Sequence, residues 1–205
     1  IRSLRLNVPV NVAFNNQETL GKLVQRLSTQ LEPDSLALEV AFTNTPFLQE
    51  NGFTEETILA LFIPNTYEFY WNTPANKIAN KLAKEYNKFW NEDRLAKAKA
   101  KNLTPIQVYT LASIVHKETA KVDERPDVAG VYLNRLRQDM PLQADPTILY
   151  AIKLRSGDFD QEIKRVFYND LRIKLPYNTY IHKGLPPGPI AMPDVSAIDA
   201  VLNAT

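Results

Sequence analysis

The sequence contains no cysteine and only two histidines. Without thiols the chain can form neither disulfides nor thiolate active sites, and this composition suits oxidising and reducing compartments alike. His116 and His182 lie far apart, and H-K-E-T is not the H-E-x-x-H pattern that places two imidazoles on one helix face. The sequence therefore predicts no metal site.

Phosphate-binding and serine-nucleophile patterns are missing as well. The six glycines form neither G-x-x-x-x-G-K-[ST] nor G-x-G-x-x-G, the loops that cradle phosphates in nucleotide-binding proteins. No G-x-S-x-G sequence is present to place a serine on a strand-to-helix turn. We therefore expect no cofactor, and a serine nucleophile is poorly supported.

Neither a dominant charge nor a long hydrophobic run is found. With 24 Lys and Arg against 23 Asp and Glu, the net charge of +1 gives no reason to expect nucleic acid as a partner. No apolar run approaches the roughly 18 residues that a membrane-spanning helix needs. Because the chain begins at Ile1, we expect it to be a fragment that lacks a targeting or anchoring segment.

Hydrophobic periodicity predicts a mainly helical α+β protein. Residues 5–14 alternate apolar and polar and read as a strand, and TYEFYW (66–71) as an extended segment or packed aromatic platform, more often core than sugar-binding surface. Residues 43–53 are expected to form a loop. Helices are expected at 18–31, 74–99, 105–121, 127–138 and 194–203. Three more are expected: a short one after Pro33-Asp34, one from Thr54 to before Pro64, and one that follows MPLQADPT and runs to about residue 154.

The helix at 105–121 carries the most informative pattern. At 100° per residue, Glu118 falls within about 20° of the centre of the apolar stripe through Leu111, whereas His116 falls at about 140°. We therefore expect Glu118 on the buried stripe and His116 facing water. A carboxylate in that position must be paired, hydrogen-bonded or protonated, because an unpaired buried charge is costly.

Two interpretations of Glu118 stay open from the pattern alone. The first is a structural ion pair, for which Arg125, Arg135 and Arg137 are the candidate partners. The second is a general acid that desolvation keeps protonated, as in enzymes that cleave glycans.

Two further segments are candidates for binding a ligand. PLQADPT (141–147) presents Gln143, Asp145 and Thr147, although Asp145 before Pro146 is also a typical helix cap. The Pro/Gly-rich stretch at 175–194 contains Tyr177, Asn178 and Tyr180. It is either a rigid surface crossing or a groove wall, since sugars stack on aromatic faces and rigid loops lose little entropy on binding.

Four blocks in fixed order resemble the YceG-like family of endolytic murein (peptidoglycan) transglycosylases. They are LASIVHKETA, ERPDVAGVYLNRL, MPLQADPTILYA and PYNTYIHKGLPPGPIAMP, with FIPNTYEFYW upstream. The resemblance covers about 54–205 and is weaker over 1–45. It implies a mainly helical catalytic domain at 46–205 with short strands and a Pro/Gly-rich loop wall. The end of a LysM-like region, 1–45, would precede it.

The family resemblance also implies an activity and a site. Members cleave the β-1,4 bond between N-acetylmuramic acid and N-acetylglucosamine and leave 1,6-anhydro ends, which terminates glycan elongation. Glu118 matches the family's catalytic acid. His116 stands where the family commonly has a second glutamate, so we expect His116→Glu to be mild. The family's motif positions, taken as substrate-binding, are Asn134, Gln143, Asp145, Tyr177, Asn178 and Tyr180.

Partners and location follow from the same resemblance. We expect peptidoglycan glycan strands as substrate, cell-wall synthases as possible partners, and no nucleic acid. The full-length protein is expected to be single-pass in the inner membrane with its catalytic part in the periplasm. This fragment, which we expect to be truncated at its C-terminus too, is expected to be soluble. A non-catalytic peptidoglycan-binding module and a hydrolase that uses water remain as alternatives.

Overall fold

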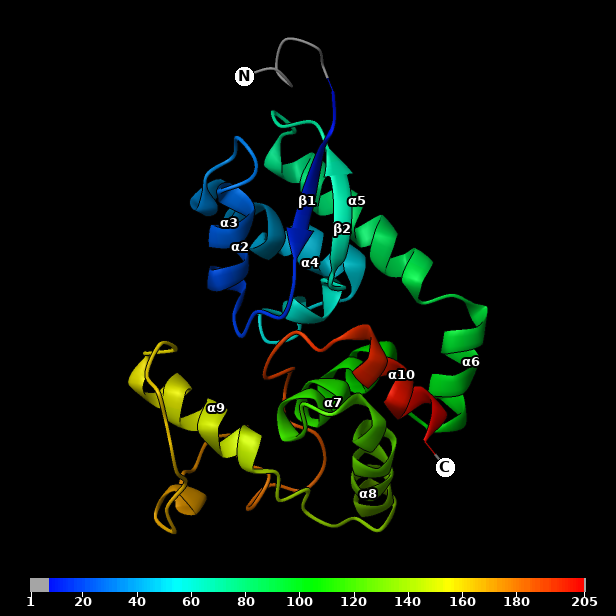
Figure 1. The fold of residues 1–205 in the computed structure, drawn as a ribbon, viewed down its shortest axis with the longest axis vertical. Coiled ribbons are helices and arrows are strands. Elements are labelled where there is room, and N and C mark those ends of the chain that lie inside the picture. Colours follow the sequence, from blue (N-terminus) through cyan, green and yellow to red (C-terminus); the bar gives the residue numbers. More distant parts are fainter. Residues whose placement is uncertain (1–7, 205) are drawn as a thin grey trace.

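The computed structural model describes residues 8–204 and is a mostly helical α+β fold (Figure 1). Its two strands are β1 (Val10–Phe14) and β2 (Asn65–Phe69). Its helices are α2 (Leu20–Ser28), α3 (Ser35–Thr43), α4 (Thr45–Asn51), α5 (Ala75–Phe89), α6 (Glu92–Ala100), α7 (Pro105–Glu118), α8 (Arg125–Arg137), α9 (Asp145–Ser156) and α10 (Val195–Asn203). Short 3-10 turns are η1 (Ile58–Leu61), η2 (Val122–Glu124) and η3 (Asp170–Arg172). This confirms the expected fold class in outline.

The two strands form a small antiparallel sheet that joins distant parts of the chain. Val12 pairs with Tyr67, and the stacked rings of Phe14 and Tyr67 lie 5.3 Å apart. Tyr67 and Phe69 are buried, so these aromatics of TYEFYW belong to the core. The sheet links residues on both sides of residue 45, where a domain boundary is expected; that boundary stays a prediction. Residues 5–7 of the expected strand lie outside the described residues.

Two predicted elements are wrong, and the helix expected from Thr54 to before Pro64 is only the 3-10 turn η1. The helix expected at 74–99 is broken between α5 and α6, because Trp90 leaves helical geometry and Asn91 caps a new helix by accepting a 3.0 Å hydrogen bond from the Arg94 amide. The loop expected at 43–53 contains α4. Asn44 caps the start of α4, and Gly52, with φ of 73°, ends it in the left-handed conformation.

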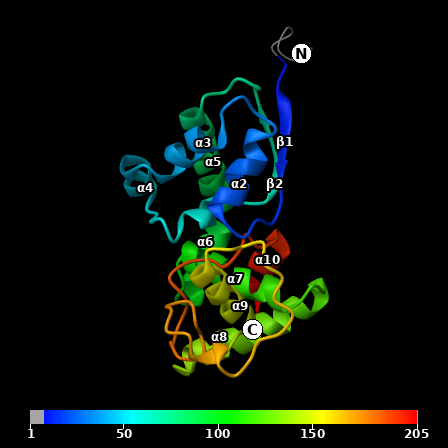
Figure 2. The same ribbon diagram turned by 90° about the vertical axis from the view of Figure 1, so that its left-hand side faces the viewer.

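Helix α7 lies at the centre of the half of the molecule that carries the sequence blocks. Its start matches expectation, since Thr104 caps the helix, Pro105 is its first residue, and Thr104 and Gln107 form a reciprocal capping box. Both views place the sheet and α2–α5 at one end of the molecule and α7–α10 at the other (Figures 1 and 2). The Tyr109 hydroxyl donates a 2.6 Å hydrogen bond to the Phe62 carbonyl, which ties α7 to the sheet end.

The Pro/Gly-rich stretch at 175–194 is irregular, as expected, and packs against α7. The amide of Ile190 donates a 3.0 Å hydrogen bond to the buried hydroxyl of Ser113. Gly188 lies so close to the Glu56 carbonyl that a Cβ there would come within 2.0 Å of it. Every helix within residues 8–204 is too short or too polar to span a lipid bilayer.

Candidate active site

The end of α7 exposes Glu118 and shelters His116, the reverse of the helical-wheel prediction. The Glu118 side chain is exposed, whereas that of His116 is only 16% exposed. The Nδ1 atom of His116 lies 3.3 Å from Oδ2 of Asp194 and 3.2 Å from Nη2 of Arg125. The prediction fails because α7 is buried on all sides from 108 to 115, so the apolar stripe no longer indicates which side is covered at its last turn.

Glu118 is held by a tyrosine rather than by an arginine. The Tyr132 hydroxyl of α8 donates a 3.0 Å hydrogen bond to Oε2 of Glu118. Burial raises the pKa of Tyr132, and the charge of Glu118 and this hydrogen bond raise it further, so the phenol keeps its proton. Tyr132 therefore orients the carboxylate and leaves its other oxygen open to a ligand.

The expected ion pair of Glu118 with an arginine is wrong. Within residues 8–204 Glu118 makes no ion pair, and the three candidate arginines have other partners. Arg125 pairs with Asp194 at 3.1 Å and donates to Ser196. Arg135 donates to the Leu142 carbonyl at 2.5 Å and Arg137 to Oδ1 of Asn134 at 3.1 Å. The buried-pair interpretation of Glu118 is thereby removed.

The segment at 141–147 is locked to the Pro/Gly-rich stretch by Thr179. The backbone amide of Gln143 donates a 3.0 Å hydrogen bond to the Thr179 carbonyl. The backbone amide of Ala144 donates one of the same length to the Thr179 hydroxyl. The hydroxyls of Thr147 and Thr179 lie 2.8 Å apart. Gln143 has a φ of 52°, an uncommon conformation for a residue with a side chain. It places Oε1 of Gln143 3.3 Å from Nη1 of Arg135.

Asp145 is bound by Tyr180 and does not cap its helix. The residue before α9 is Ala144, with no side-chain cap, so the predicted Asp145 cap is wrong. The Tyr180 hydroxyl instead donates a 2.5 Å hydrogen bond to Oδ1 of Asp145. Burial raises the pKa of Tyr180 to about 12, with further contributions from this bond and from the charges of Asp145 and Glu118. The charge of Glu118 thus acts on the same tyrosine that binds Asp145.

The remaining candidate residues do not join this group directly. Asn178 is fully buried and donates through Nδ2 to the carbonyls of Leu171 and Ile173, at 3.0 and 2.9 Å. Its Oδ1 accepts from the Tyr180 amide at 2.9 Å. Tyr177 is buried, its ring 4.7 Å from that of Tyr150. Asn178 therefore supports the backbone of Tyr180, and Tyr177 packs in the core. Asn134 is exposed on α8.

Sequence reasoning missed three residues of this site. Tyr132 reads as one apolar residue of its helix, Arg135 as an ion-pair partner, and Thr179 as a spacer between two tyrosines. Their roles depend on contacts between α7, α8 and the two loops, and no local spacing encodes such contacts. The family block that contains Tyr132 was the only signal available for it.

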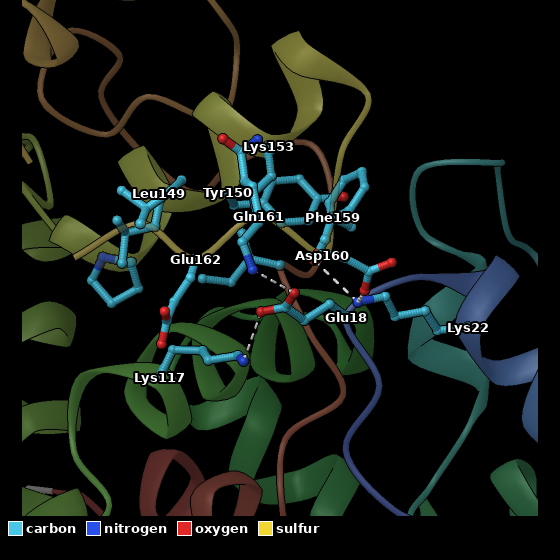
Figure 3. Close-up of a pocket in the computed structure, with 13 residues that line it drawn as sticks. Glu18, Lys22, Lys117, Leu149, Tyr150, Lys153, Phe159, Asp160, Gln161 and Glu162 are labelled. Carbon is cyan, nitrogen blue, oxygen red and sulfur yellow. Dashed lines mark hydrogen bonds and ion pairs between the residues drawn. The ribbon is translucent and has the colours of Figure 1, made fainter. Parts of the chain in front are cut away.

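A cavity of about 440 Å³ is lined by residues of α7, α9 and the segment before α2 (Figure 3). Lys117, next to Glu118, and Pro146, next to Asp145, both line it. Oε1 and Oε2 of Glu18 lie 2.9 Å from Nζ of Lys117 and 2.8 Å from Nζ of Lys153. Burial acts to raise the pKa of Glu18, but hydrogen bonds from both lysines outweigh burial and hold it below the usual value. Glu18, which the sequence did not single out, therefore ties the segment before α2 to α7 and α9.

Comparison with known proteins identifies the class to which this fold and site belong. A family model described as "YceG-like family" matches residues 1–205, and the chain belongs to this family. The resemblance in the sequence blocks is thereby confirmed.

Individual relatives are similar over parts of the chain. An endolytic murein transglycosylase of Streptococcus pneumoniae serotype 2 is 44% identical over 109 residues, 52% of this chain and 19% of that protein. The one from Bacillus subtilis is 36% identical over 141 residues, 68% of this chain and 37% of its own length. The chain thus matches less than two-fifths of these curated relatives.

A solved structure extends the similarity to the fold. The crystal structure of a yceG-like protein from Listeria monocytogenes has a TM-score of 0.74 and 26% identity, and the match covers 96% of this chain and 67% of that one.

Proposed function

We propose that the chain carries the catalytic part of an endolytic lytic transglycosylase acting on peptidoglycan. It would cleave the β-1,4 bond between N-acetylmuramic acid and N-acetylglucosamine in nascent strands, leaving 1,6-anhydro ends and terminating elongation. The names of the relatives support the reaction class. The carrying observation is an exposed carboxylate, Glu118, held by the Tyr132 hydroxyl at 3.0 Å, whose charge also raises the pKa of Tyr180 in the Asp145–Tyr180 pair.

Glu118 would serve first as acid and then as base. Its protonated carboxyl donates to the glycosidic oxygen as the bond from the anomeric carbon breaks and the N-acetylglucosamine hydroxyl leaves. The muramic 6-hydroxyl attacks that carbon, and the Glu118 carboxylate takes its proton. An intramolecular nucleophile gains from proximity, so no second carboxylate is needed to activate water.

Because Glu118 is exposed, a bound glycan strand would complete its surroundings. A strand laid over the end of α7 would exclude water from the place where the proton is transferred. Tyr132 would hold the carboxyl in place before and after that transfer.

The other candidate residues would divide between binding and support. We propose that Gln143, Asp145, Tyr180 and, on α8, Asn134 contact the glycan strand, since their polar groups lie at or near the surface. Tyr177 and Asn178 would act indirectly, because they are buried and hold the loop that presents Tyr180.

Glu118→Gln tests the catalytic role. We expect this variant to keep its melting temperature, because Glu118 is exposed, and to release no anhydro-muropeptides from purified peptidoglycan. Asp123→Asn, an exposed acid on η2, is the matched control and should release them at the parent rate. Full release by Glu118→Gln would contradict the assignment.

The chemistry of the product ends separates the alternatives. Anhydro ends in mass spectra support a transglycosylase, and reducing ends would indicate a hydrolase that uses water. Binding without any cleavage by the parent chain would indicate a peptidoglycan-binding module that positions synthesis partners. The relatives' names do not favour that last option.

Location, partners and the first region are proposed from the family resemblance. The full-length protein would be anchored by one inner-membrane helix with this part in the periplasm, near cell-wall synthases. The region at 1–45 would be the end of a LysM-like region. Fractionation of cells that express the full-length protein tests the anchor.

A further inference from the structure

A second cavity opens on the Asp145–Tyr180 side of the candidate site. It has a volume of about 320 Å³, at the small end of ligand-binding pockets. Asp145 and Tyr180 form one wall, and the other comes from the segment after α9 that ends in η3, drawn in gold and orange in Figure 1. The lining residues of that second wall are Arg165, Val166, Phe167, Tyr168 and Leu171.

Two aromatic side chains at this cavity are unusually exposed. Phe167 is 62% and Tyr168 89% exposed, whereas Tyr67 and Phe69 of the sheet are buried. Single exposed apolar residues are ordinary, but neighbouring exposed apolar side chains at the rim of a cavity are a feature of binding sites. Tyr150 and Phe159, which line the larger cavity, pack against each other with ring centroids 5.5 Å apart. Phe167 and Tyr168 thus present aromatic surface that no core contact explains.

The segment that carries these rings is fixed by hydrogen bonds. The Phe167 amide donates a 2.9 Å bond to the Asp170 carboxylate, and the Asp170 amide donates a 2.9 Å bond to the Phe167 carbonyl. Buried Asn178 binds the Leu171 carbonyl, so the same side chain supports this segment and Tyr180. A surface held in this way loses little conformational entropy when a ligand binds.

One cation accompanies the aromatic surface. The Arg165 guanidinium lies 5.7 Å from the centre of the Phe167 ring, and within residues 8–204 it makes no ion pair. A guanidinium binds a carboxylate in a two-pronged geometry. The combination of aromatic faces and a cation suits a sugar unit that bears an acidic substituent.

We propose that this cavity is a glycan subsite, in which Phe167 and Tyr168 stack on sugar rings and Arg165 binds a carboxylate of the peptide that a muramic residue carries on its lactyl group. The inference rests on the proposed function for its substrate class. The cavity is lined by Asp145 and Tyr180 as well, so a sugar bound in it would hold one side of the strand in place while Glu118 acts on the glycosidic bond. Phe167, Tyr168 and Arg165 are thereby binding residues outside the reacting group.

Binding in a Glu118→Gln background tests the subsite without turnover. Two probes are used: uncross-linked glycan strands, whose muramic residues carry stem peptides with free carboxylates, and chitotetraose, which has neither peptide nor carboxylate. Phe167→Ala and Tyr168→Ala should each weaken both probes about three- to tenfold, the size of an aromatic contact. Arg165→Gln should weaken the muramic strands several-fold and leave chitotetraose unchanged.

Tyr70→Ala is the matched control, an aromatic that is 48% exposed just after β2 and outside the candidate site. It should bind both probes like the parent, and all four variants should keep the parent melting temperature. Equal binding by every variant, loss in Tyr70→Ala as large as in Tyr168→Ala, or no binding by the parent overturns the proposal.

The proposed function fails separately from the subsite. With Glu118 intact, missing anhydro products together with the expected binding losses would remove the transglycosylase and leave the subsite. Anhydro products together with unchanged binding in all variants would do the reverse.

Discussion

The Tyr132 hydroxyl on α8 donates a 3.0 Å hydrogen bond to the carboxylate of Glu118 at the end of α7. A hydrogen bond to a charged group is stronger than one between neutral groups, and this one crosses the turn that joins two helices. It therefore fixes the direction of a side chain that would otherwise move freely in solvent. The orientation of Glu118 in the candidate site therefore depends on this contact.

Tyr132→Phe should lower kcat about ten- to hundredfold and change KM little. The substitution keeps the ring and removes only the donor, and a bond to a charged group contributes roughly 1.5–3 kcal/mol. Rates of anhydro-product release measure the effect. Leu133→Ile on the same helix is a packing control. An unchanged kcat in Tyr132→Phe would show that Glu118 needs no such support.

Thr179→Val should destabilise the protein by about 1–3 kcal/mol. The buried hydroxyl accepts from the Ala144 amide and contacts the Thr147 hydroxyl, and both would lose a partner. Urea unfolding measures the change. Thr179→Ser keeps the hydroxyl and should recover most of the loss. Equal stability of Thr179→Val and the parent would mean that the two loops are held without Thr179.

Glu18→Gln should lower stability at neutral pH by about 1–3 kcal/mol, between the values for exposed and buried ion pairs. Since the two lysines hold the pKa of Glu18 below its ordinary value of about 4.5, its contribution is present above that pH and is lost as the pH falls below it. The parent should therefore lose its advantage over Glu18→Gln in acid. Melting temperatures over a pH series test this, and a constant difference would contradict it.

His116→Gln should flatten the pH dependence of stability on the acid side of neutrality. Burial lowers the pKa of His116 from 6.5, against the opposing effect of Asp194, and Arg125 and Lys117 lower it further. The neutral imidazole is the favoured form in the fold, so its contribution is lost as the pH falls below about 6.5. Equal slopes for variant and parent, measured by thermal unfolding, would show that His116 does not titrate in this range.

The structure changes the basis for expecting His116→Glu to be mild. The expectation assumed an exposed position, but the side chain lies between Arg125 and Asp194. A glutamate there could pair with Arg125, while Asp194 would oppose it. The mild effect stays a prediction that now depends on which neighbour dominates.

Local chemistry predicted most of the elements. Thr104, Pro105 and Gln107 are adjacent in the chain, so the sequence alone marks the start of α7. The strand at β1 follows from alternation, and the helical class follows from periodicity. The break at Trp90-Asn91 was missed because the apolar spacing continues through it, and only the burial of Trp90 and the cap at Asn91 interrupt the helix.

The sequence by itself determined which polar residues are candidates for the site. Its family blocks indicated that these residues, among them Glu118, Asp145 and Tyr180, belong to one site. Only the tertiary structure decided which of these side chains meet solvent. A helical wheel assumes one covered face, and α7 is covered on all sides until its last turn, where neighbouring segments enclose His116 and leave Glu118 open. The contacts of Glu118 with Tyr132 and of Asp145 with Tyr180 join residues 14 and 35 apart, which packing decides and local sequence cannot.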